Sequence, residues 1–227
     1  MREAKLRHEI IATALKMNAL GINRGKSGNV SARIRDGFLV TPTGLSYEST
    51  QPDDVVAMTL DGASRGSRLP SSEWRFHRDI YAARPEVGAI VHAHSPFATT
   101  LACLGRDIPA FHYMVAVAGG KDIRCAPYAT FGTQTLSDHA LHALAGRKAC
   151  LLANHGMIAL GVALVDALAL AVEVEGLAEQ YWRTLQIGEP NLLTDAEMDV
   201  VLAKFTKYGQ PQSRGRVARG RKPETKR

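Results

Sequence analysis

The 227-residue sequence lacks both a long apolar run and a disulfide framework. No segment approaches the ~20 uninterrupted apolar residues that a membrane-spanning helix requires. The apolar stretch near the N-terminus is interrupted by Lys16 and Asn18, which is not typical of a signal peptide. Cys103, Cys125 and Cys150 are widely spaced among apolar neighbours, which predicts buried free thiols in a reducing compartment. We therefore expect a cytoplasmic protein without a membrane partner.

Most of the chain also lacks a net charge, although the total formal charge is +6. Residues 213–227 hold seven basic side chains and one acid, and this segment accounts for the whole excess. The body has equal numbers of acids and bases, so a nucleic-acid partner is not expected for it. Residues 210–227 lack apolar periodicity and are predicted to be a disordered, solvated tail. Binding of the tail to nucleic acid or to an acidic partner is the alternative.

Apolar periodicity predicts one α/β domain over residues 1–209, with a sheet between helices. Helical patterns cover 3–20, 71–84, 96–104, 136–145, 163–187 and 195–207. Extended patterns cover 30–34, 38–40, 55–60, 87–94, 123–126, 149–153 and 157–160. A chain of this length buries enough surface to hold a core without disulfides or structural metal.

Two histidines end the strongest strand pattern. His92 and His94 are two residues apart, so on a strand both imidazoles point to one face and both could reach one ion. His155 follows a second apolar strand, and three imidazoles are a plausible ligand set for a divalent ion, with Zn²⁺ favoured. The spacing is equally consistent with a pair of hydrogen-bonded strand histidines. The remaining histidines are interpreted as surface or satisfied core residues.

Glu73 is the candidate acid/base, at the first turn of the helix that Ser71 or Ser72 is predicted to cap. Its alternative is an ordinary first-turn acid that the helix dipole stabilises. Three turns rich in Gly, Ser and Thr could bind an oxyanion through backbone N–H groups. Taken singly, these turns are equally consistent with ordinary loops and caps. Their residues are Gly28, Asn29, Thr43, Gly44, Ser71 and Ser72.

Together these pieces resemble the class II aldolase family, in its small zinc-dependent branch. The likeness runs in order over about nine tenths of the chain. The stretches that carry it are GNVSAR (28–33), VTPTGLSYE (40–48), LPSSEWRFH (69–77), VHAHS (91–95), IPAFHYMVAVAGG (108–120), CAPYATFGT (125–133), NHGMIA (154–159) and KFTKYG (204–209).

The resemblance implies the fold and the site. The fold would have a central, mainly antiparallel sheet covered by helices on both faces. The Zn²⁺ ligands would be His92, His94, His155 and, in the resting enzyme, Glu73. The substrate phosphate would bind Gly28, Asn29, Thr43, Gly44, Ser71 and Ser72. The aldehyde end of the pocket would be shaped by Phe131, Phe205 and Tyr208.

The family also implies a reaction. A 1-phosphoketose would be cleaved between C3 and C4 into dihydroxyacetone phosphate and an aldehyde. Glu73 would move the C3 proton, and Tyr113 would handle the proton on the leaving aldehyde oxygen. The active sites would lie between subunits of a cyclic homotetramer, where a neighbour contributes Tyr113.

The motifs favour L-fuculose 1-phosphate as substrate, with lactaldehyde as the second product. An aldolase acting on 5-deoxyribulose or 5-methylthioribulose 1-phosphate would keep every residue above, and it remains the main alternative. A ribulose-5-phosphate 4-epimerase is less favoured, because it carries Asp where this chain has Glu73 and differs over HYMVAVAGG. A dehydratase of the methionine-salvage type is less similar around the His pair. A non-catalytic module like the adducin head is least favoured, because all three histidines and Glu73 are present.

Overall fold

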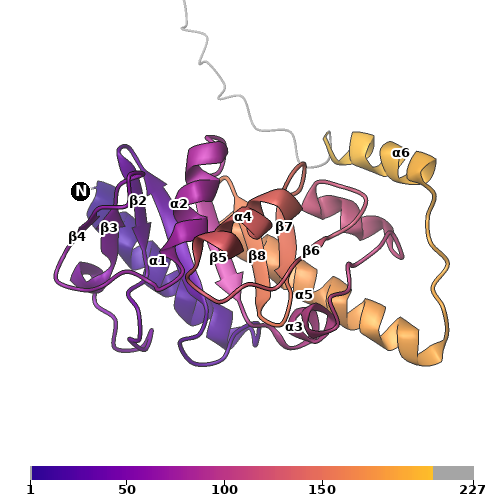
Figure 1. Ribbon diagram of the computed structural model, residues 1–227, viewed down its shortest axis with the longest axis horizontal. Helices are drawn as coiled ribbons and strands as arrows, with labels where there is room; N and C mark the ends of the chain where they lie inside the picture. The colour runs from indigo at the N-terminus through magenta and orange to yellow at the C-terminus, as the bar shows by residue number, and fades with distance from the viewer. Residues whose placement is uncertain (1, 207–227) are drawn as a thin grey trace, which may run out of the picture.

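The computed structural model describes residues 2–206, so Tyr208 and the basic tail of residues 210–227 lie outside the described residues (Figure 1). The α-helices are α1 (Arg2–Ala19), α2 (Trp74–Ala83), α3 (Pro96–Cys103), α4 (Gln134–Ala143), α5 (Leu164–Ile187) and α6 (Asp195–Phe205). Two 3₁₀ helices are η1 (Pro52–Asp54) and η2 (Tyr113–Ala118). The strands are β1 (Asn29–Ile34), β2 (Gly37–Val40), β3 (Val56–Met58), β4 (Ser64–Arg65), β5 (Ala89–Ala93), β6 (Cys125–Ala126), β7 (Ala149–Leu152) and β8 (Gly156–Gly161).

The eight strands form one sheet in the order β4-β3-β2-β1-β5-β8-β7-β6. Neighbouring strands are antiparallel except at one end, where β6 and β7 are parallel. The prediction of a mainly antiparallel central sheet is therefore confirmed. β5 lies between β1 and β8. In this register His92 of β5 lies opposite Asn29 of β1 on one side and opposite Ile158 of β8 on the other.

Helices cover both faces of this sheet, as predicted (Figure 1). One face packs against α1, α3 and α5, and its apolar side chains include Val91 of β5. The other face packs against α2 and α4, and its apolar side chains include Ile90. Because side chains alternate along a strand, His92 points to the same face as Ile90. The start of α2 therefore covers the histidine side of β5.

Several local predictions needed correction. Helix α2 begins at Trp74, so Glu73 occupies the N-cap position and neither Ser71 nor Ser72 caps the helix. The strand predicted at 55–60 is shorter, and the turn after it contains the additional edge strand β4. No helix is expected from the sequence at η2, which lies inside the motif IPAFHYMVAVAGG (108–120). All three cysteines are free, but only Cys150 is buried; Cys103 is exposed on α3.

None of the helices in residues 2–206 is both long enough and apolar enough to cross a membrane. Helix α5, the longest, spans 24 residues and lies along the sheet face formed by β5 and β8. Its buried residues recur with helical spacing, which accounts for its packing as a core helix.

Candidate metal centre and active site

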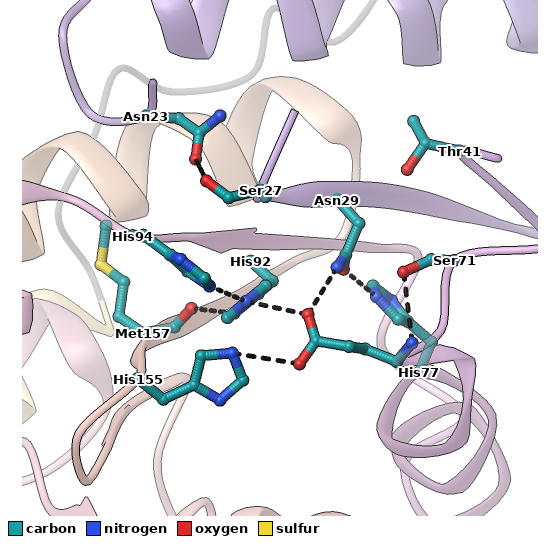
Figure 2. Close-up of polar contacts among 12 residues, drawn as sticks. Asn23, Ser27, Asn29, Thr41, Ser71, His77, His92, His94, His155 and Met157 are labelled. Carbon is teal, nitrogen blue, oxygen red and sulfur yellow. Dashed lines mark hydrogen bonds and ion pairs between the residues drawn. The ribbon is translucent and has the colours of Figure 1, made fainter. Parts of the chain in front are cut away.

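Two chain segments bring the three histidines together. β5 carries His92 and ends at Ala93, so His94 follows directly on the same face. His155 lies in the turn between β7 and β8, where Asn154 has a left-handed backbone with φ 55°. Asn tolerates this conformation better than most residues, and the turn directs His155 back toward β5. Figure 2 shows the three imidazoles turned toward one another.

Helix α2 contributes the carboxylate. Glu73 precedes Trp74, its backbone N–H donates to Ser71 Oγ at 3.3 Å, and its side chain is only 5% exposed. Glu73 Oε2 lies 3.1 Å from His92 Nε2, and Glu73 Oε1 lies 3.1 Å from His155 Nε2. His92 Nε2 lies 3.0 Å from His94 Nε2. One ligand atom from each of the four residues thus falls within 4.8 Å of the others.

The hydrogen bonds identify what this cluster fits. His92 Nδ1 lies 2.8 Å from the Met157 carbonyl oxygen, which only accepts, so Nδ1 carries the proton. Nε2 of this ring faces Glu73 Oε2 and His94 Nε2, where it can offer a lone pair to a metal ion. Glu73 Oε1 is buried without a hydrogen-bond donor. Acceptor atoms that converge in this way repel one another unless protons or a cation lie between them, so the donor set fits a divalent metal ion.

Burial and charge set the protonation of the cluster. Burial by itself would raise the pKa of the Glu73 carboxyl, but the adjacent His92 and His155 imidazoles outweigh it and hold this pKa well below its usual range. Burial, followed by repulsion from His92 and His155, lowers the pKa of His94 to about 3. A neutral imidazole beside an ionised carboxylate is the protonation state that metal ligation requires.

The segment after His94 is held from the opposite side of the sheet. Both carboxylate oxygens of Glu175, on α5, accept backbone N–H groups at the start of α3, from Phe97 and Ala98, at 2.8 Å each. This carboxylate takes the place of a local cap, since the Ser95 side chain makes no capping bond. The long helix α5 therefore fixes where α3 begins, directly after the second histidine of the pair.

A cleft of about 260 Å³ opens onto the cluster. Its lining includes Glu73, His94 and His155, and it also includes Ser72 from one of the predicted phosphate turns. The lining also includes two aromatic residues, Tyr128 and Phe131, which are 60% and 65% exposed. The sequence motifs predicted Phe131 in this role but missed Tyr128, whose only sequence signal is a second aromatic in the same Gly- and Thr-rich loop. Ser27, Ala129 and Asn154 complete the lining.

The three predicted phosphate turns lie at the same end of the sheet. Asn29 Nδ2 donates to Glu73 Oε2 at 3.0 Å, so the first turn contacts the carboxylate. Lys26 Nζ donates to the Gly44 carbonyl oxygen at 2.7 Å, so the first turn also contacts the second. Ser71 N–H donates to the Thr41 carbonyl at 3.0 Å, which joins the second turn to the third. Tertiary contacts thus link three turns that are each weak signals in the sequence.

Within residues 2–206, those predicted for the C4 proton and the C-terminal side of the aldehyde pocket are not part of this cleft lining. Tyr113 begins η2, is 51% exposed, and is not part of the cleft lining among the described residues. Phe205, at the end of α6, packs against the core formed with α5. Tyr208 lies outside the described residues, so its predicted role at the aldehyde end is not addressed by the structure.

A family model described as Class II Aldolase and Adducin N-terminal domain matches residues 8–182. The chain therefore belongs to the class II aldolase family, a class that the sheet order and the His/Glu cluster also fit. It is an aldehyde-lyase of the metal-dependent type.

The chain is similar to characterised members of this family over nearly its whole length. It is 61% identical over 204 residues to a 5-methylthioribulose-1-phosphate/5-deoxyribulose-1-phosphate aldolase of Rhodospirillum rubrum, covering 90% of this chain and 92% of the relative. It is 51% identical over 210 residues to an L-fuculose phosphate aldolase of Escherichia coli K12, covering 92% and 98%. A solved L-fuculose 1-phosphate aldolase superposes with a TM-score of 0.86 at 41% identity, covering 89% of this chain and 96% of that one.

Proposed function

We propose that this protein is a zinc-dependent aldolase that cleaves 5-methylthioribulose 1-phosphate or 5-deoxyribulose 1-phosphate between C3 and C4. The products would be dihydroxyacetone phosphate and either methylthioacetaldehyde or acetaldehyde. The observation that carries the reaction type is the buried Glu73–His92–His94–His155 cluster at the floor of the cleft. The substrate choice is supported by the 61% identity to an aldolase named for these two substrates.

The candidate substrates differ in their aldehyde halves. The aldehyde halves of the two proposed substrates lack the hydroxyl group of lactaldehyde, the product expected from L-fuculose 1-phosphate. Tyr128, Ala129 and Phe131 line the cleft, but they belong to the stretch CAPYATFGT that either kind of aldolase would keep, so they do not discriminate between these substrates. L-fuculose 1-phosphate, favoured by the motifs alone and named for a relative at 51% identity, is the second candidate.

Each proposed site residue has a separate part in the chemistry. Three neutral imidazoles and Glu73 would hold Zn²⁺, which when bound stabilises the negative charge that develops on the dihydroxyacetone phosphate half. Glu73 would shuttle the C3 proton, because its carboxylate borders the cleft: it would deliver a proton to C3 after cleavage and remove that proton in the reverse condensation. Tyr113 would take the C4 hydroxyl proton as the C3–C4 bond breaks and the aldehyde forms.

The exposure of Tyr113 bears on assembly. Its ring lies on the surface of η2, outside the cleft of its own chain. This position supports a homotetramer in which Tyr113 of a neighbouring subunit completes each active site. In such an assembly a lone subunit would bind the metal but would lack the residue that handles the C4 proton.

The joined turns support a phosphate site. Gly28, Asn29, Thr43, Gly44, Ser71 and Ser72 would bind the substrate phosphate with backbone N–H and hydroxyl groups. Lys26 extends from the first turn to the Gly44 carbonyl and would add a positive charge at its rim. Because the phosphate lies remote from the bond that breaks, its binding energy orients the reacting carbons.

The direct test is release of dihydroxyacetone phosphate by zinc-loaded enzyme in a coupled assay. The panel is 5-methylthioribulose, 5-deoxyribulose, L-fuculose and L-rhamnulose 1-phosphates, with Glu73→Gln enzyme as the control for contaminating activity. We expect the first two to have the highest kcat/KM. A higher kcat/KM with L-fuculose 1-phosphate would overturn the substrate assignment. Release from none of the four, with zinc bound, would overturn the aldolase itself and would favour the 4-epimerase, and then an adducin-like binding module.

A further inference from the structure

A buried chain of hydrogen bonds leads away from Glu73 into the space between β1 and α2. Glu73 Oε2 accepts from Asn29 Nδ2, and Asn29 Oδ1 lies 2.5 Å from His77 Nε2. His77 Nδ1 lies 2.7 Å from Ser31 Oγ, which lies 2.8 Å from the Tyr81 hydroxyl. Figure 2 shows Asn29 between the metal-site histidines and His77. Ser31 and His77 are completely buried, and Tyr81 is 1% exposed.

The ionised end of this chain fixes the direction of the bonds next to it. A carboxylate only accepts, so the amide nitrogen of Asn29 faces Glu73 and its oxygen faces His77. Nε2 of His77 must then carry a proton in order to donate to that oxygen. Burial, followed by repulsion from His92, lowers the pKa of His77 to about 3, so the ring is neutral and its Nδ1 accepts.

The remaining bonds follow from the neutral ring. Ser31 must donate its only hydroxyl proton to His77 Nδ1, and it therefore accepts from Tyr81. Arg33 holds Tyr81, the last residue of these hydrogen bonds. Its guanidinium donates to the Tyr81 carbonyl at 2.8 Å, and its Cζ atom lies 4.7 Å from the Tyr81 ring centre. Phe76 packs against His77 with ring centres 4.6 Å apart, which keeps water from the chain.

We propose that His77 is a positioning residue for the Glu73 carboxylate and acts on it through the Asn29 amide. In its Nε2–H tautomer, His77 prevents the Asn29 amide from rotating by half a turn, which would point its oxygen at the carboxylate. Glu73 is thereby held beside His92 and His155, where it serves the metal and the C3 proton. The catalytic consequence rests on the proposed aldolase function, whereas the effect on the metal site does not.

The test compares His77→Leu with His77→Gln in zinc-loaded protein. Leu fills the space but cannot donate, whereas the Gln amide reaches the position of Nε2 and restores a donor to Asn29. Ile80→Val, one turn further along α2 in the same buried layer, is the matched packing control. The readouts are zinc affinity, from competition with a chelating dye, and kcat and KM on the best 1-phosphoketose of the panel.

For His77→Leu we expect zinc affinity and kcat each to fall about 10-fold or more, the scale for residues that orient metal ligands. We expect a smaller change in KM than in kcat, since Asn29 is one of six proposed phosphate-binding residues and the other five lie outside these hydrogen bonds. His77→Gln should recover most of both losses, and Ile80→Val should show neither. Equal zinc affinity in all three variants would overturn the proposal, even if the wild-type protein cleaved none of the panel substrates.

A second measurement keeps the proposal falsifiable if His77→Leu does not fold. In zinc-loaded protein labelled with ¹⁵N-histidine, wild-type His77 should give the NMR signature of a neutral ring protonated at Nε2. Ser31→Ala removes the donor to Nδ1, and it should weaken that tautomer together with zinc affinity. A wild-type ring protonated at Nδ1 would overturn the proposal.

Discussion

The carbonyl oxygen of His92 lies so close to Gly28 that a Cβ atom on Gly28 would be 2.6 Å from it. Antiparallel pairing places Asn29, the first residue of β1, opposite His92 in β5. The first of the proposed phosphate turns and His92, a proposed metal ligand, are therefore in backbone contact. Gly28 is required there because its missing side chain allows β1 to approach β5.

Gly28→Ala should therefore destabilise the protein. The added methyl group would also meet Asn23 Oδ1 at 2.8 Å and Met17 Cε at 2.9 Å, and relief of such overpacking costs about 1–3 kcal/mol. Gly176→Ala is the matched control. Gly176 lies within helix α5, and a Cβ atom added there would meet nothing within 4 Å. That change should stabilise the fold by about 0.5–1 kcal/mol. Urea unfolding of both variants checks the prediction, and equal shifts in the same direction would contradict it.

Glu73→Gln should keep the fold and most phosphate affinity but reduce turnover by about 10²-fold or more, the scale for a general acid/base. The amide keeps the shape of the side chain but neither ligates metal as a carboxylate does nor accepts the C3 proton. Glu86→Gln, in the exposed turn that follows α2, is the control and should leave kcat unchanged. Near-normal turnover of Glu73→Gln would refute its assignment.

Asp79 should make stability dependent on pH. Partial burial would raise the pKa of its carboxyl, but hydrogen bonds from Arg78, Ser137 and Gln134 lower it below the usual value. A lowered folded pKa means that the stabilisation is present above the unfolded pKa of about 4 and is lost as the pH falls through the folded pKa. Asp79→Asn should therefore be less stable than wild type at neutral pH, and this gap should shrink near pH 3. Urea unfolding of both proteins at the two pH values measures this difference in the free energy of unfolding. A difference that widens on acidification would contradict the prediction.

Removal of metal should lower both stability and activity. Without a cation, the buried ligand atoms of Glu73 and the three histidines must be kept apart or protonated. Metal in 100-fold excess over its dissociation constant would stabilise the fold by about 2.7 kcal/mol. Thermal unfolding before and after chelation, and again after added Zn²⁺, tests this. The protein could instead be purified with little zinc, and added zinc could neither stabilise nor activate it. That result would support the non-catalytic module.

Much of the site could be predicted because its residues carry local patterns. Two histidines at strand spacing must share a face, whatever the rest of the fold does. The ordered motifs then connected Glu73, His155 and the phosphate turns to that face. His77 was interpreted as a surface or satisfied core residue, and it is a satisfied core residue in the structure, with both ring nitrogens hydrogen-bonded. Its connection to Glu73 has no local signal, because Asn29 and His77 are 48 positions apart.

Local sequence patterns identify the family, the alternation of helices and strands, and the residue types of the His/Glu cluster. These depend on periodicity and motif spacing, which are properties of short segments. The three-dimensional arrangement was needed to show that Glu73 occupies the N-cap of α2, that Cys103 is exposed, and that Tyr113 lies outside the cleft of its own chain. These depend on strand register and on which helix covers which face, and such contacts join residues far apart in the chain.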